Sequence, residues 1–299
     1  VPIPNTLLDI LLACNMALAF TIMFTTMFAK EVLDMSYYPT ILLFTTIFRI
    51  ALNVSSTRLI LSTGNPGNVV ATFGQFVGGG DMVIGIVVFI ILILVQFIVI
   101  NKGSERVAEV TARFTLDAMP GKQMAIDADL NTGAITDEDA RNRREKIQQE
   151  SAFFGSMDGA TKYVKGDATA GLVITVLNFV GGIALGMIND GGTFNDALQK
   201  YSLLTIGDGL VSQIPSLMIS LATGLLVTKS AKEAEISDIM LSQLFASPKV
   251  MYIVGASLIG LGIFTPLQWY IFVLYGAMFI FVGYRMNENI AVHEIEGEI

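Results

Sequence analysis

The chain has 299 residues, of which 53% are hydrophobic and only 15% are charged, and its mean hydropathy is +0.64. Soluble domains carry about 25% charged residues, so this composition excludes an ordinary soluble protein and indicates a polytopic membrane protein. The net charge of −8 disfavours nucleic acid as a partner, and a single Cys with a single His excludes a disulfide framework and a Cys/His zinc site. No phosphate-binding loop or metal motif occurs, so we expect no metal, no organic cofactor and no enzymatic activity.

Six apolar windows are long enough to cross a membrane, which takes about 20 residues. In chain order they are Leu7–Phe28, Tyr38–Ile60, Met82–Ile100, Ala168–Ile188, Tyr201–Thr228 and Val250–Tyr284. As one helix, the last window would be about 52 Å long, against a hydrocarbon core of about 30 Å. Thr265-Pro266 in its middle predicts a break between two short antiparallel helices. The sequence therefore predicts an all-α membrane protein with seven spans.

The positive residues predict how these spans are oriented. If the segment after the third span is cytoplasmic, 15 of the 18 Lys and Arg residues lie on the cytoplasmic side. This places Val1 outside and the C-terminus in the cytoplasm. A start on the outside without a signal peptide predicts a further span upstream, eight in the full protein.

The charge distribution divides the chain into four segments. Residues 1–101 form a first transmembrane group of three spans, and 102–167 form a cytoplasmic helical loop. Residues 168–285 form a second group of four spans, and 286–299 begin an acidic linker to a further domain. Within the loop, Pro120-Gly121 is expected to end a first polar helix. Gly133 is expected to form a turn before a charged helix near Asp137–Phe154.

Four stretches of the sequence resemble one family of proteins. The longest is Arg106–Asp129, with Phe114-Thr-Leu-Asp and Met119-Pro-Gly-Lys-Gln-Met-Ala-Ile-Asp; the others are Phe48–Leu61, Gly155–Ala168 and Gly207–Pro215. Together they resemble the export-gate proteins of bacterial flagella and type III secretion systems, the FHIPEP family. The Ser62–Asn68 loop and the Ala125–Asn131 run resemble the flagellar form more than the injectisome form.

This resemblance implies a multi-pass component of the bacterial inner membrane that couples the proton motive force, or a sodium gradient, to the export of unfolded proteins. It implies a ring of nine copies around the export channel, surrounded by lipid. The other export-gate membrane proteins, the export ATPase complex and substrate–chaperone complexes would be partners. Members of this family usually have a further helix before Ile3-Pro4 and a large cytoplasmic domain after the last span, which would bind the last two partners.

Asp208 is the first candidate site residue. An ionisable group inside a span costs at least about 2.5 kcal/mol on insertion scales, so it usually faces protein or a water-filled path and has a function. Gly207 and Gly209 flank it, and Pro215 follows, so we expect a local break in this helix. Asp208 either relays protons or is paired permanently with Arg49 or Arg58.

Asp167 precedes the fourth apolar window and has two interpretations. As a helix N-cap it would accept backbone N–H bonds at the start of the span. As a gate it would pair with Lys162 or Lys165 and exchange that partner on protonation. The resemblance supports the gate, because aspartates that match Asp167 and Asp208 are the family's candidates for proton translocation.

Arg49 and Arg58 lie nine residues apart, about 13.5 Å along a helix and on roughly opposite faces. Only one of them is therefore expected to line any cavity, while Arg58, nearer the outer end, can instead extend to the interface. The candidate proton pathway comprises Asp208, Asp167, Lys162, Arg58 and Arg49.

The resemblance also assigns a signature export loop that assembles the gate and links it to ion flow. Its residues are Arg106, Glu109, Arg113, Asp117, Pro120, Gly121 and Lys122. The alternative for these residues is a solvated helix with ion pairs worth a few tenths of a kcal/mol.

Small residues at four-residue spacing predict close contacts between helices. They are Gly182 with Gly186, and Ala256 with Gly260.

For the whole chain, the alternative function is a proton- or sodium-coupled secondary transporter without protein cargo. A paired set of broken helices would indicate it.

Overall fold

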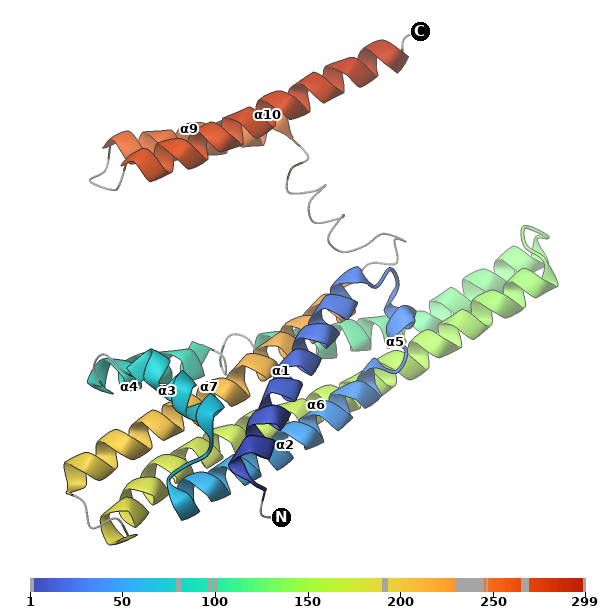
Figure 1. Ribbon diagram of the computed structural model, residues 1–299. Coiled ribbons are helices and arrows are strands. Elements are labelled where there is room, and N and C mark those ends of the chain that lie inside the picture. Colours follow the sequence, from blue (N-terminus) through green and yellow to red (C-terminus); the bar gives the residue numbers. More distant parts are fainter. Residues whose placement is uncertain are drawn as a thin grey trace. The chain divides into compact units, whose positions relative to one another are not determined.

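The computed structural model describes residues 3–78, 82–95, 98, 102–189, 193–229, 245, 247–264 and 269–297, which are almost entirely helical. The chain divides into two compact units, residues 1–233 and 234–299 (Figure 1). The first contains α1 (Asn5–Phe28), the 3₁₀ turn η1 (Val32–Met35), α2 (Tyr38–Thr63), α3 (Asn68–Gly78), α4 (Met82–Val95), α5 (Lys102–Asn131), α6 (Asp137–Asn189) and α7 (Phe194–Val227). The second contains α9 (Pro248–Phe264) and α10 (Trp269–Gly297). The described fold is all-α, as the sequence predicts.

Among the described residues, five helices are long and apolar enough to span a membrane, or six if α3 and α4 form one bent span. The predicted number of seven is therefore too high. In the described part of the window Met82–Ile100, the structure has the short α4, which is bent by 105° relative to α3. The last window gives α9, a 17-residue helix of about 26 Å, and α10, which is longer than predicted. The expected break at Thr265-Pro266 lies outside the described residues.

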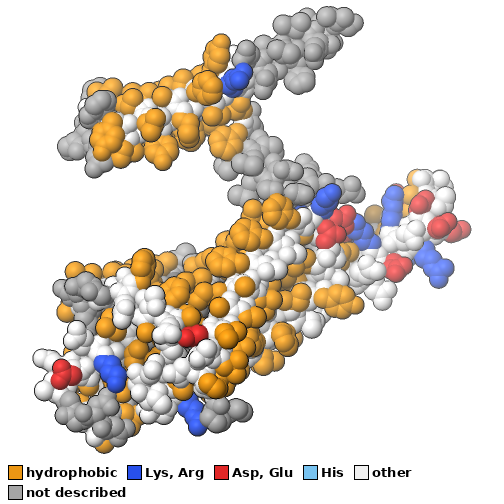
Figure 2. Space-filling model, viewed as in Figure 1, with side chains coloured by type: hydrophobic (Ala, Val, Ile, Leu, Met, Phe, Trp, Pro, Cys, Tyr) orange, Lys and Arg blue, Asp and Glu red, His pale blue; other side chains and the backbone are white. Residues whose placement is uncertain are grey.

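Side-chain type also separates the membrane-facing part of the first unit from the rest. Hydrophobic side chains cover the face of the helical bundle seen in Figure 2, whereas Lys, Arg, Asp and Glu gather toward the far end of α5 and α6. Many large apolar residues of α1, α2, α4 and α6 are exposed. Since such continuous exposure is costly in water, these helices lie in a lipid bilayer.

The central helix is α7, which packs against α1 to α6 within the first unit. It continues without interruption through Gly207, Asp208 and Gly209, which corrects the predicted break. A Cβ atom on Gly207 would lie 2.0 Å from the carbonyl oxygen of Val70, and one on Gly74 would lie 2.1 Å from that of Leu203. These glycines are therefore needed for backbone contact between α3 and α7, not for a bend.

The predicted small-residue contact in α6 is present. Cβ atoms on Gly182 and Gly186 would each lie 2.4 Å from the ring of Tyr201. The two glycines thus let the ring of this α7 tyrosine pack directly against the backbone of α6.

In the second unit the close helix contact is at Gly255, one position before the predicted Ala256. A Cβ on Gly260 would meet nothing within 4 Å, whereas one on Gly255 would lie 2.7 Å from the Gly276 carbonyl oxygen. Gly255 and Gly276 therefore bring α9 and α10 together. The stretch after Tyr284, expected to be a linker, continues α10 as helix to Gly297.

A carboxylate on α1 fixes the start of α3. Asp9 accepts hydrogen bonds from the backbone N–H groups of Asn68 at 2.9 Å and Val69 at 3.0 Å. Gly67, with φ 109°, precedes them, and a Cβ there would lie 2.5 Å from Asp9 Oδ1. Asp9 therefore caps α3 from another helix, and it also interacts favourably with the positive end of the helix dipole.

The polar segment forms a helical hairpin of α5 and α6. Its turn is at Gly133, with φ 75°, and its contact surface includes Met119 and Ile126 of α5 against Ala140 and Ile147 of α6. Contrary to the expectation for Pro120-Gly121, α5 runs through both residues. Packing against α6 therefore outweighs the loss of one backbone hydrogen bond at the proline.

Replacing Pro120 with alanine is expected to stabilise this part of the hairpin by about 1 to 3 kcal/mol, because a proline inside a helix costs roughly 3 kcal/mol. Hydrogen exchange of the peptides around residue 120 in the full chain would measure the change. Gly121→Ala is the control, since its Cβ would meet nothing within 4 Å and the gain is about 1 kcal/mol or less. Equal protection in Pro120→Ala and the native chain would contradict the prediction.

Candidate functional site

Three helices of the first unit turn polar residues toward one another. On α2, Arg49, Asn53 and Ser56 recur at helical spacing, and all three are buried. Asp167 of α6 and Asp208 of α7 are also buried. Residues three or four apart share one face of a helix, so each helix presents a polar stripe to its neighbours inside an apolar bundle.

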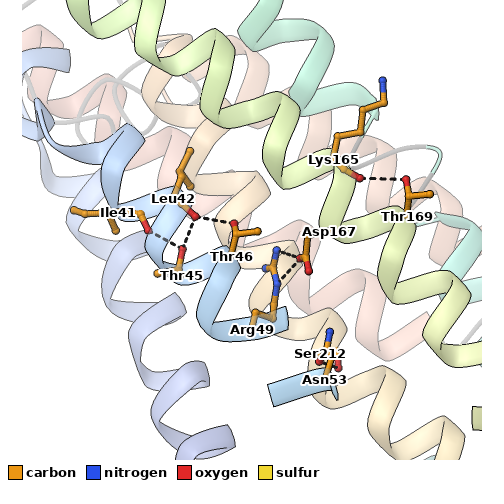
Figure 3. Close-up of polar contacts among 10 residues, drawn as sticks. All are labelled: Ile41, Leu42, Thr45, Thr46, Arg49, Asn53, Lys165, Asp167, Thr169 and Ser212. Carbon is orange, nitrogen blue, oxygen red and sulfur yellow. Dashed lines mark hydrogen bonds and ion pairs between the residues drawn. The ribbon is translucent and has the colours of Figure 1, made fainter. Parts of the chain in front are cut away.

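The strongest contact in this group is an ion pair between Arg49 and Asp167 (Figure 3). Arg49 Nε donates to Asp167 Oδ2 at 2.7 Å, and Nη2 donates to the same oxygen. Only 2% of the Arg49 side chain and 4% of the Asp167 side chain are exposed. The pair therefore joins α2 to α6 where water is largely excluded, and each charge depends on the other.

The structure corrects both interpretations of Asp167. It lies in the interior of α6, which begins at Asp137, so it is not an N-cap. Its partner is Arg49, while Lys162 pairs with Asp158 at 2.6 Å, one turn away on the same helix. The apolar window begins at Asp167, but the helix does not, because the charged segment before it is helical as well.

Asp208 has a different set of neighbours. Asn178 Nδ2 of α6 donates to Asp208 Oδ2 at 2.9 Å. The Ser56 side chain of α2 lies beside the same carboxylate, and its hydroxyl donates to the Asn53 carbonyl oxygen at 3.0 Å. One turn further, Ser212 donates to Asn53 Oδ1 at 2.8 Å. Permanent pairing of Asp208 with Arg49 or Arg58 is therefore wrong, because Asp167 holds Arg49 and neutral side chains contact Asp208.

A cavity of about 60 Å³ lies between the two carboxylates. Both Asp167 and Asp208 line it, together with Arg49. The other lining residues are Asn53, Ile93, Ala168, Gly171, Leu172, Ile174, Thr175, Gly209, Ser212, Gln213 and Ser216. The site thus brings together three of the five residues of the candidate proton pathway.

The other two pathway candidates lie elsewhere. Arg58 and Lys162 are exposed, and neither lines this cavity. Arg49 alone of the two arginines reaches it, as their spacing indicates.

The signature residues also lie outside the cavity, on α5. Arg106 pairs with Glu109 at 2.9 Å, and Lys122 with Glu150 at 2.9 Å. Arg113, Asp117, Pro120 and Gly121 are exposed. The beginning of α5 nevertheless belongs to the bundle, because Ala108 and Ala112 join the same buried cluster as residues of α7.

The sequence analysis did not identify Asn53, Ser56, Asn178 or Ser212 as site residues. Their signal was periodic: Asn53 follows Arg49 by four positions, and Ser212 follows Asp208 by four. Polar residues on the same face as an intramembrane charge are its natural partners.

The ionised side chains of the site do not balance one another in formal charge. Arg49, Asp167 and Asp208 carry one positive and two negative formal charges when both carboxylates are ionised. A single proton on either carboxylate makes the set neutral, which is favourable in a medium of low dielectric constant. Within the described residues, no group of three His, Cys, Asp or Glu side chains gathers to hold a metal ion.

These features define a helical membrane protein with a charged site inside its bundle. A family model described as the FHIPEP family matches residues 1–298. The chain belongs to the FHIPEP family.

Several relatives carry a flagellar name. The chain is 54% identical to a flagellar biosynthesis protein FlhA of Bacillus subtilis, over 89% of this chain and 39% of the relative. It is 50% identical to proteins of the same name from Proteus mirabilis, over 95% of this chain, and Salmonella typhimurium, over 92%. The match covers 41% of each of these two relatives, so the chain spans about two fifths of the length of the relatives. No solved structure matches the chain.

Proposed function

We propose that this chain is the membrane part of an export-gate component of the bacterial flagellum and that it couples proton movement to the export of unfolded proteins. Family membership and the names of the relatives support the flagellar export role. The observation that carries the coupling role is the cavity lined by the buried residues Asp167, Asp208 and Arg49. Among the residues that the structure describes, Asp208 has no cationic partner. An ionisable side chain inside a membrane span is costly, which supports a functional role for it.

In this proposal a proton that reaches Asp167 weakens its attraction to Arg49. The pair joins α2 and α6, so its strength influences how these two helices pack. The proton then passes to or from Asp208 on α7. No cofactor takes part, and the coupling ion is a proton.

The cellular arrangement follows from the family and from the positive residues. The protein lies in the inner membrane with the C-terminus and the α5–α6 hairpin in the cytoplasm. It forms a ring with further copies of itself and contacts other export-gate membrane proteins. The export ATPase and substrate–chaperone complexes bind mainly outside the segment described here.

Proton flux into vesicles that contain the full-length protein tests the coupling. Asp208→Asn and Asp167→Asn are each expected to reduce the flux to that of empty vesicles, because an amide cannot take up and release the proton. Asp137→Asn, the same change at the exposed first turn of α6, is the control and retains native flux. Secretion of a flagellar protein from cells carrying each variant reports export in parallel. Native flux in both site variants would contradict the proposal and show that another component couples the proton.

A further inference from the structure

Buried polar atoms without partners occur on the ion pair and on the three helices that form the site. In the described part of the chain, five buried side-chain atoms lack a hydrogen-bond partner. They are Arg49 Nη1, Thr57 Oγ1, Asp167 Oδ1, Asn178 Oδ1 and Thr205 Oγ1. All five belong to α2, α6 or α7. Arg49 and Asp167 form the ion pair and line the cavity, and Asn178 contacts Asp208 through its other side-chain atom.

Two of these atoms, Arg49 Nη1 and Asp167 Oδ1, belong to charged groups. Leaving a buried charged group short of a hydrogen bond costs more than about 1 to 3 kcal/mol. Lipid cannot supply the missing partner, because hydrocarbon neither donates nor accepts. A polar ligand that is not part of the protein is the remaining source.

The cavity supplies the space for such a ligand. Arg49 and Asp167 both line it, and the remaining lining includes the hydroxyls of Thr175, Ser212 and Ser216. One water molecule needs about 10 to 15 Å³ of space of this kind together with two to four polar partners. The cavity, with about 60 Å³, meets both requirements for a few molecules, and it is too small for an organic solute.

We propose that this cavity binds a small cluster of ordered water molecules that joins Asp167 to Asp208. The water accepts from Arg49 Nη1 and donates to Asp167 Oδ1 at one end. At the other end it contacts Ser212 and the carboxylate of Asp208. Protein donors serve the two carboxylates separately, Arg49 for Asp167 and Asn178 for Asp208, so the water supplies the link between them.

The existence of the water site is independent of the proposed function, whereas its role in proton transfer rests on that function. Hydrogen-bonded water bridges groups nearly as well as direct contact does. It therefore lets the two carboxylates share one proton while α6 and α7 keep their packing.

X-ray hydroxyl-radical footprinting of the full-length protein in vesicles detects bound water through modification of the side chains beside it. Leu172, Ile174 and Ile93 line the cavity and are expected to be modified faster than exposed apolar residues of the same helices, such as Val176 and Leu177. Modification of the cavity residues no faster than of these two would show a dry cavity and overturn the proposal.

A cavity-filling variant tests the water site and its role in proton transfer separately. Gly171 lines the cavity on the same face of α6 as Asp167, and a Cβ there would meet nothing within 4 Å. Gly171→Leu therefore extends an apolar side chain into the space from a Cβ without close neighbours, and it is expected to abolish both the fast modification and the proton flux. Gly166→Leu, on the same helix, exposed and also without neighbours within 4 Å, is the matched control and retains both.

The outcomes of this experiment distinguish the two proposals. Fast modification that persists in a folded Gly171→Leu protein would overturn the water site. Fast modification without proton flux in the native protein would keep the water site and overturn the proposed function. Modification lost in Gly171→Leu with flux unchanged would show that the water lies off the proton route and overturn its role as the link.

Discussion

Replacing Arg49 with glutamine is expected to destabilise the bundle by about 3 to 5 kcal/mol, because the change leaves a buried carboxylate without its cation. The Asp167 side chain is only 4% exposed, so water cannot take the place of the guanidinium without opening the contact between α2 and α6. Urea unfolding of the full chain in detergent, followed by circular dichroism, measures the effect.

Two further variants test whether the loss comes from the unpaired charge. Arg49→Met combined with Asp167→Leu removes both charges and is expected to recover most of the stability, since apolar residues of similar volume often replace a buried pair without loss. Arg143→Gln breaks an exposed pair with Asp129, whose side chains are 53% and 49% exposed, and is expected to cost less than about 1 kcal/mol. A double variant no more stable than Arg49→Gln would show that side-chain shape, not charge, determines the loss.

Replacing Gly207 with alanine is expected to cost about 3 kcal/mol or more, the upper part of the range for overpacking. The new Cβ would lie 2.0 Å from the carbonyl oxygen of Val70 and 2.9 Å from the amide nitrogen of Gly74. Both are backbone atoms of α3, so relief requires the whole helix to move away from α7. The same unfolding measurement applies.

Gly155→Ala is the matched control for this substitution. Gly155 lies within α6, and a Cβ there would meet nothing within 4 Å. Alanine has the higher helix propensity, so a gain of up to about 1 kcal/mol is expected. If Gly207→Ala and Gly155→Ala unfold alike, α3 and α7 are not in the backbone contact described above.

Apolar windows and charges inside them predicted the helices and the main candidates, Asp208, Asp167 and Arg49. They could not predict the pairing of Arg49 with Asp167, because that depends on the rotation of α2 against α6, which is set by packing along their whole length. The sequence identified charged positions correctly and assigned their partners wrongly for this reason.

Local rules failed where tertiary contacts opposed them. Pro120 is a helix breaker by propensity, yet packing of the hairpin keeps α5 continuous. Gly207 and Gly209 were interpreted as a weak point in α7, but a glycine that loosens a helix in isolation also permits close approach of a neighbour. Only the position of α3 and α4 decides between these two effects.

The continuity of α6 has a mechanical consequence. From Asp167 to its beginning at Asp137, the helix extends about 45 Å without a joint. A tilt of about 5° about Asp167 would displace that end by roughly 4 Å, a distance comparable to most of one helical turn. A tilt of α6 at the ion pair would therefore be amplified along the helix and would reach the polar hairpin as a displacement of several ångströms.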